Sequence, residues 1–145
     1  DVFRDHKLEP GISDMREDYI QHNPLFRTGK AGFREAFGAM LSESAPVPSQ
    51  PEEESYKSEG DLFIHNLKMG FLKYFREGCS DMDIKRVIAE GDLVVVHAHF
   101  DLPDPRYPKG VALIDIFRVQ DGMVAEHWDV VQAIPLEEAN DNTMF

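Results

Sequence analysis

Residues 111–135 read VALIDIFRVQDGMVAEHWDVVQAIP, and this stretch decides the fold. Two runs rich in β-branched residues, 111–119 and 124–133, flank the dipeptide Asp121-Gly122. Asp-Gly between two such runs is typical of a tight β-hairpin turn. The stretch therefore predicts two neighbouring antiparallel strands.

The chain before this hairpin changes in character from helical to β-rich. The run LVVVHAHF at 93–100 predicts a third strand, and the proline-rich residues 101–110 predict a long loop after it. Earlier, 13–19 is a candidate short helix, and apolar residues recur at helical spacing over 33–41. Helices followed by antiparallel strands predict an α+β fold, with the helices packed on one face of a curved sheet.

The length of 145 residues predicts a single domain spanning 1–145. Within it, residues 42–81 combine an acidic loop rich in proline and serine with an amphipathic helix. We interpret 42–81 as an insertion in this domain.

The composition limits the partners and the compartment. A net charge of −12 with scattered Lys and Arg argues against nucleic acid and against an anionic membrane surface. The apolar runs are too short to span a membrane. A lone cysteine, Cys79, excludes an intramolecular disulfide and favours a cytoplasmic location. The chain begins at Asp1 rather than Met, which leaves room for a removed targeting segment.

Alternate residues of a strand share a face, so the three β-rich runs each offer a mostly apolar face with ionisable groups on it. If these faces point the same way, they form an apolar pocket with a few convergent polar groups, as small-molecule sites do. The alternative is that the histidines face solvent on an open sheet. The ionisable groups are His97, His99, Asp115, His127 and Asp129.

Asp115 lies in the middle of an apolar run, where a carboxylate must be paired, hydrogen-bonded or functional. His127 and Asp129 are two residues apart on one predicted strand, and Asp115 is expected across the hairpin from them. A carboxylate in apolar surroundings has a raised pKa and can act as a base near neutral pH. A nearby imidazole could stabilise an oxyanion or orient the acid.

A metal site is a further alternative. The spacing of Gly91, His97 and His99 resembles the opening of the first cupin motif. The acidic ligand expected shortly afterwards is poorly matched by Asp104, and the second cupin motif is absent. We therefore expect neither a metal ion nor another cofactor.

Four segments resemble SnoaL-like proteins, the polyketide cyclase family of the nuclear-transport-factor-2-like superfamily. They are GDLVVVHAHF at 91–100, the hairpin 111–135, DYIQHNP at 18–24 and GKAGFREAF at 29–37. The resemblance implies a cone-shaped α+β barrel, in which a strongly curved, mostly antiparallel sheet wraps around N-terminal helices and encloses a pocket.

The resemblance also implies a chemistry. SnoaL-like cyclases close a ring by aldol condensation without a cofactor, and their relatives include isomerases, dehydratases and hydrolases. The position of Asp129 matches their general acid/base. The position of Asp115 matches a pocket residue that is usually His in the cyclases, so this chain departs from their pattern. His22 matches a third signature residue, expected to line the same cavity with Tyr19 beside it.

We therefore expect a cofactor-independent enzyme acting on a small, fairly apolar carbonyl compound, by aldol cyclisation, isomerisation or elimination through an enolate. Asp129, Asp115 and His127 are the predicted catalytic residues. The predicted substrate-binding residues are His22, Tyr19, His97, His99 and Phe117. The alternative is a non-catalytic ligand-binding or dimerisation domain. By analogy, a homodimer is expected through the outer sheet face, with Trp128 and Val130 as contacts.

Overall fold

The computed structural model describes residues 8–41, 82–102 and 104–145. The predicted insertion and its amphipathic helix, at 42–81, lie outside the described residues. The helices are α2 (Leu8–Ser13) and α3 (Lys30–Leu41). The strands are β1 (Met15–Gln21), β2 (Met82–Glu90), β3 (Leu93–Phe100), β4 (Val111–Gln120) and β5 (Met123–Ala133).

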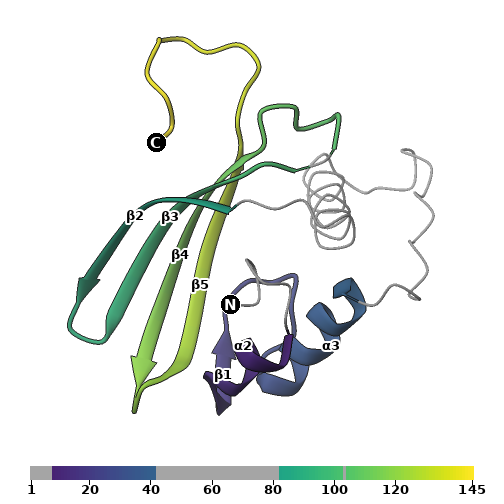
Figure 1. Ribbon diagram of the computed structural model, residues 1–145, viewed down its shortest axis with the longest axis vertical. Helices are drawn as coiled ribbons and strands as arrows, with labels where there is room; N and C mark the ends of the chain where they lie inside the picture. The colour runs from purple at the N-terminus through teal and green to yellow at the C-terminus, as the bar shows by residue number, and fades with distance from the viewer. Residues whose placement is uncertain (1–7, 42–81, 103) are drawn as a thin grey trace.

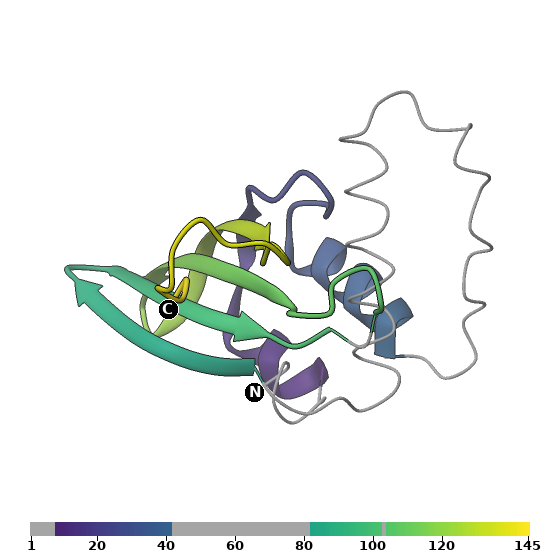
Figure 2. The same ribbon diagram turned by 90° about the horizontal axis from the view of Figure 1, so that it is seen from above.

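The strands form one mixed sheet in the order β1-β5-β4-β3-β2. β1 runs parallel to β5, and the other neighbouring pairs are antiparallel. Figures 1 and 2 show that the sheet formed by the described strands curls strongly without closing into a barrel. They also show that α2 and α3 lie beside β1. The predicted α+β class with a curved, mostly antiparallel sheet is confirmed, whereas the enclosed pocket stays a prediction.

The turn between β4 and β5 joins the central strand pair of the sheet. Asp121 and Gly122 have φ angles of 53° and 75°, the left-handed conformation that both central residues of a type I′ turn require. The predicted hairpin is therefore confirmed. The register shifts by one residue between Arg118 and Val119, and beyond this shift Asp115 lies directly opposite Asp129 and Phe117 opposite His127.

The helix predicted at 13–19 is wrong, because the chain forms β1 from Met15 onwards. Met15 and Tyr19 are buried while the residues between them are mostly exposed. Pairing with β5 supplies the backbone hydrogen bonds of this segment and overrides its local helical preference. The helix predicted over 33–41 is confirmed and begins three residues earlier, at Lys30.

The chain between β1 and α3 folds back against the end of β1. The backbone N–H of Gly29 donates to the carbonyl of Tyr19 at 2.9 Å. The N–H of Gln21 donates to Oγ1 of Thr28 at 3.2 Å. These bonds fix the backbone of the last residues of β1 relative to α3.

The apolar core occupies one end of the inner face of the sheet, which we define as the face that carries Val111 and Leu113 of β4. Phe33 and Phe37 of α3 stack at 4.1 Å between ring centroids and belong to the same buried cluster as Val111 and Leu113. Further along β4 on this face, the next inward residue is Asp115. The inner face therefore changes from packed and apolar to polar within two residues.

The outer face of the sheet carries several exposed apolar side chains. Val130 on β5 is 69% exposed, and Ile114 on β4, Leu93 on β3 and Ile88 on the edge strand β2 are also exposed on this face. No helix within the described ranges is long and apolar enough to cross a membrane.

Gly110 immediately precedes β4 and lies against the end of β3. Its φ is +73°, and a Cβ atom there would lie 2.1 Å from the carbonyl oxygen of Phe100. We expect Gly110→Ala to lower the free energy of unfolding by about 2–4 kcal/mol, through backbone strain and overpacking. Urea unfolding measures this loss.

Gly91→Ala is the matched control. Gly91 also has a positive φ, of +60°, but a Cβ atom there would meet nothing within 4 Å, so only the strain of about 1 kcal/mol is expected. Equal losses in the two variants would contradict the packing argument.

Candidate active site

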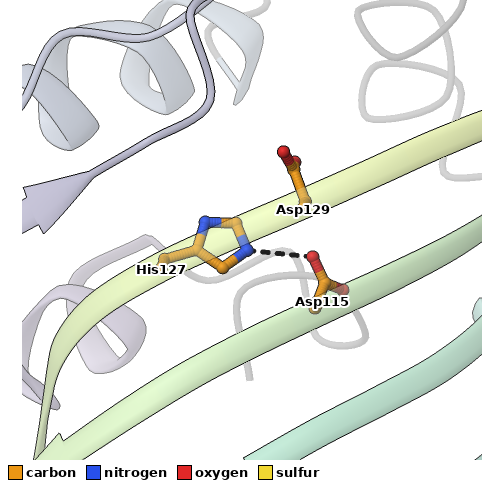
Figure 3. A group of neighbouring side chains, drawn as sticks. All are labelled: Asp115, His127 and Asp129. Atoms are coloured by element: carbon orange, nitrogen blue, oxygen red, sulfur yellow. Dashed lines mark hydrogen bonds and ion pairs between the residues drawn. The ribbon is translucent and has the colours of Figure 1, made fainter.

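Three ionisable side chains meet on the inner face where β4 and β5 pair. Asp115 comes from β4, and His127 and Asp129 come from β5 (Figure 3). Each can present one ligand or proton-transfer atom so that these atoms lie within 4.8 Å of one another. Asp115 and His127 are each 9% exposed, and Asp129 is half-buried. The structure thus brings together the three predicted catalytic residues.

Asp115 and His127 form a buried hydrogen-bonded pair. Nε2 of His127 lies 2.9 Å from Oδ1 of Asp115. Burial raises the pKa of the Asp115 carboxyl and the nearby Asp129 carboxylate adds to this rise, whereas the bond to His127 opposes it. The result is an acid that holds its proton at higher pH than an exposed aspartate does.

Asp129 is held by an amide from the loop after β1. The side-chain nitrogen of Asn23 donates to both carboxylate oxygens of Asp129, at 2.8 and 2.7 Å. The Asn23 oxygen in turn accepts a bond from the backbone N–H of Leu25 at 2.9 Å. Since Asp129 is half-buried, its carboxylate combines a fixed position with access from solvent.

β1 adds two further polar residues to this group. Nδ1 of His127 lies 3.1 Å from Oε1 of Gln21, and Nε2 of Gln21 donates to the hydroxyl of Tyr19 at 3.0 Å. Tyr19 is 2% exposed, and burial together with the Asp129 and Asp115 charges raises its pKa. Its hydroxyl is therefore neutral and part of the same network, as the prediction that Tyr19 lies beside the site requires.

Sequence reasoning missed Gln21 and Asn23. Neither side chain titrates, so a search for ionisable groups passes over both. The signal that could have found them is strand alternation through YIQHN, where Tyr19, Gln21 and Asn23 occupy every second position. It requires β1 to be recognised as a strand.

The same alternation places His22 on the outer face, so its predicted position in the cavity is wrong. Its ring stacks on Trp128 with centroids 4.8 Å apart, and its Nε2 lies 2.7 Å from Glu126. His22 and Arg118 both lower the pKa of Glu126. Trp128 lies on the face opposite the site, as predicted.

The prediction that His97 and His99 share a face with Asp115 is also wrong. Asp115 pairs with Val96, so the even-numbered residues of β3 face inward and the odd-numbered ones face outward. His97 lies beside Arg86, with 2.6 Å between Nδ1 and the guanidinium nitrogen. His99 bonds the carbonyl of Lys109 through Nε2 at 2.9 Å.

Phe117 lies on the inner face, as its proposed contact with substrate requires. Its ring stacks on His127 with centroids 4.7 Å apart and an interplanar angle of 16°. This stacking restricts the tilt of the imidazole and gives the polar group an apolar border.

The residues considered above as cupin-like metal ligands do not come together among the described residues. His97 and His99 face outward, and Asp104 instead accepts bonds from the backbone and guanidinium of Arg106. Asp115, His127 and Asp129 have the donor types and spacing of a three-ligand metal site. The same atoms suit proton transfer.

Residues 66–127 match the family model of the SnoaL-like domain. The matched range includes β2, β3, β4 and the first residues of β5, with Asp115 and His127. The resemblance to SnoaL-like proteins is thereby confirmed. Among curated proteins, none matches the chain.

Solved structures of similar fold include a protein from Kribbella flavida DSM 17836, with a TM-score of 0.51 and 8% identity, over 90% of this chain and 78% of that chain. TsrD from Streptomyces laurentii has a TM-score of 0.48 and 19% identity, over 90% and 79%. An LEH-like epoxide hydrolase of M. tuberculosis has a TM-score of 0.48 and 12% identity, over 90% and 74%. At these identities the Kribbella protein supports the fold alone.

The raised pKa of Asp115 predicts a pH-dependent stability. Below the ordinary value of 3.8, the carboxyl is protonated in both the folded and the unfolded chain. As pH rises from there to the folded pKa, only the unfolded chain loses the proton, so the folded state is progressively destabilised. The amide introduced by Asp115→Asn cannot ionise, so the stability of the wild type relative to this variant should fall over this range. The loss is about 1.4 kcal/mol for each unit of raised pKa.

Urea unfolding at several pH values from 3 to 8 measures this difference. Asp141→Asn is the control, because Asp141 is exposed in the C-terminal segment. A difference between wild type and Asp115→Asn that does not change with pH would contradict the assignment.

Proposed function

We propose that this chain is a cofactor-independent acid/base enzyme that acts on a small, fairly apolar carbonyl compound. The observation that carries the proposal is the buried Asp115–His127 pair beside the half-buried carboxylate of Asp129. Two carboxyl groups in different environments can divide the roles of acid and base. The match to the SnoaL-like domain supports a family in which such chemistry occurs.

In this proposal Asp129 is the base. Its carboxylate is accessible from solvent, and Asn23 holds both of its oxygens. It would take a proton from the carbon next to the substrate carbonyl, leaving an enolate. The carbonyl oxygen then becomes negatively charged and requires a donor.

Asp115 and His127 would supply that donor. The pair holds a proton between Oδ1 and Nε2, and the raised pKa of Asp115 keeps a proton in the site at higher pH. A hydrogen bond or proton from this pair would stabilise the enolate oxygen. The same intermediate serves aldol cyclisation, isomerisation and elimination, so these remain the proposed reaction types.

The surroundings favour an apolar substrate without negative charge. Phe117 stacks on the imidazole, and Val94 and Val96 of β3 lie on the same face as Asp115 and Phe117. The negative charge of the Asp129 carboxylate would repel an anionic substrate. A neutral ketone or enone with an apolar body fits both features.

Deuterium exchange tests the proton-abstraction step. A panel of neutral aromatic and aliphatic ketones is incubated with the protein in D2O, and mass spectrometry follows deuterium uptake at the carbon next to the carbonyl. For ketones that the wild type labels, Asp129→Asn should slow the uptake by about 10²–10⁴-fold, since it removes the base. Asp141→Asn, an exposed aspartate outside the site, should leave the uptake unchanged.

Equal uptake with the wild type and Asp129→Asn would refute the role of Asp129. Ketones that bind without any exchange would instead support a non-catalytic ligand-binding domain of the same fold.

We also propose that the chain forms a homodimer through its outer sheet face. Val130 is 69% exposed there, beside Ile114 at 36%, and Trp128 lies on the same face. Val130→Asp would place a charge in this interface and should shift sedimentation from dimer to monomer. Gln132→Asp, on the same face, tests whether any added charge has this effect. An unchanged mass with Val130→Asp would contradict this interface.

A further inference from the structure

The orientation of the Gln21 side chain is fixed by a backbone group. The N–H of Asn23 lies 2.9 Å from Oε1 of Gln21, and a backbone N–H can only donate. The atom that it meets must therefore be the amide oxygen. The other end of the amide agrees with this assignment, since its nitrogen donates to the Tyr19 hydroxyl at 3.0 Å.

The oriented amide determines the protonation of the His127 ring. Oε1 of Gln21 is an acceptor only, and it lies 3.1 Å from Nδ1 of His127. Nδ1 must therefore carry a proton in order to bond. Figure 3 shows that the other ring nitrogen, Nε2, faces Asp115, at 2.9 Å from Oδ1. Nε2 is then the ring nitrogen that can gain or lose a proton.

Asn23 is oriented in the same manner. The backbone N–H of Leu25 donates to its oxygen at 2.9 Å, so its nitrogen is the atom that meets Asp129. That nitrogen can only donate, and both oxygens of Asp129 accept from it. Two side-chain amides therefore bond the site residues: Gln21, at the end of β1, bonds His127, and Asn23, in the loop after β1, bonds Asp129.

We propose that Gln21 is a positioning residue, which holds His127 as the Nδ1–H tautomer and thereby confines the mobile proton to the bond between Nε2 and Asp115. Its importance for turnover rests on the function proposed above. Without the amide oxygen, the neutral imidazole could carry its proton on Nε2 and leave Nδ1 bare. The ring could then neither accept the Asp115 proton nor return it.

The remaining groups around His127 fit this role. Asp115 approaches from β4 and Asp129 from β5, and Tyr19 of β1 has a neutral hydroxyl. Phe117 covers one side of the ring. Among the described residues that contact the ring, Gln21 is the group bonded to Nδ1.

Nitrogen-15 NMR of the histidine rings tests the assignment without a substrate. In the wild type, the neutral ring of His127 should carry its proton on Nδ1 and leave Nε2 without one. Gln21→Met removes the acceptor at similar length and should give a mixture of the two neutral tautomers. Gln21→Glu keeps an oxygen for Nδ1–H and should restore the wild-type pattern.

Gln132→Met is the matched control, because Gln132 lies on the outer face of β5 and should leave the His127 spectrum unchanged. A wild-type His127 with the proton on Nε2 and a bare Nδ1 would overturn the proposal. So would a folded Gln21→Met with the wild-type pattern. If Gln21→Met does not fold, the wild-type and Gln21→Glu spectra still show whether His127 is held as the Nδ1–H tautomer.

The deuterium-exchange assay then links the tautomer to turnover. Gln21→Met should slow exchange by at least about tenfold, and Gln21→Glu should recover part of the rate, because an acid/base group contributes about 10²–10⁴-fold. The recovery with Gln21→Glu separates positioning from a general loss of structure. A wild-type tautomer as proposed, but no effect of Asp129→Asn on exchange, would refute the proposed function and leave the role of Gln21 at the ring standing.

Discussion

The Asp115 carboxyl lies in the middle of a strand that is otherwise mostly apolar, and its burial has to be compensated by hydrogen bonding. His127 provides that bond, which in turn requires the imidazole to have a defined orientation. Gln21 and Phe117 supply the orientation from β1 and β4. The polar residues of the inner face thus depend on one another, and the first requirement is the hydrogen bonding of the buried Asp115 carboxyl.

The sequence allowed the antiparallel pairing of β4 and β5 to be predicted, because Asp-Gly between two β-rich runs favours a two-residue hairpin turn. Strand alternation led to the expectation that Asp115, His127 and Asp129 share a face. The turn alone would place Asp115 opposite Trp128, and the register shift between Arg118 and Val119 brings it opposite Asp129 instead. The relation between β3 and β4 could not be predicted in this way. Residues 101–110 join them, and a loop of that length leaves open which residues of β3 face inward.

The errors at β1 have a different physical origin. Residues 15–21 have no strong β pattern of their own, and their conformation depends on parallel pairing with β5, which lies about a hundred residues later in the sequence. Once the segment is a strand, alternation turns His22 outward and Gln21 inward. The neutral amides complete the site because they bond in a fixed direction at every pH, which a titrating side chain does not.

The pairing of β1 with β5 also affects how the chain reaches its folded state. The Gln21–His127 bond joins residues 106 positions apart. During synthesis, β1 leaves the ribosome long before β5 exists, so the site is completed only when β5 has been synthesised. Contacts of such high sequence separation slow folding, because the entropy of closing the long loop is lost before the contact forms. The unpaired edge of β1 is exposed to aggregation throughout this interval.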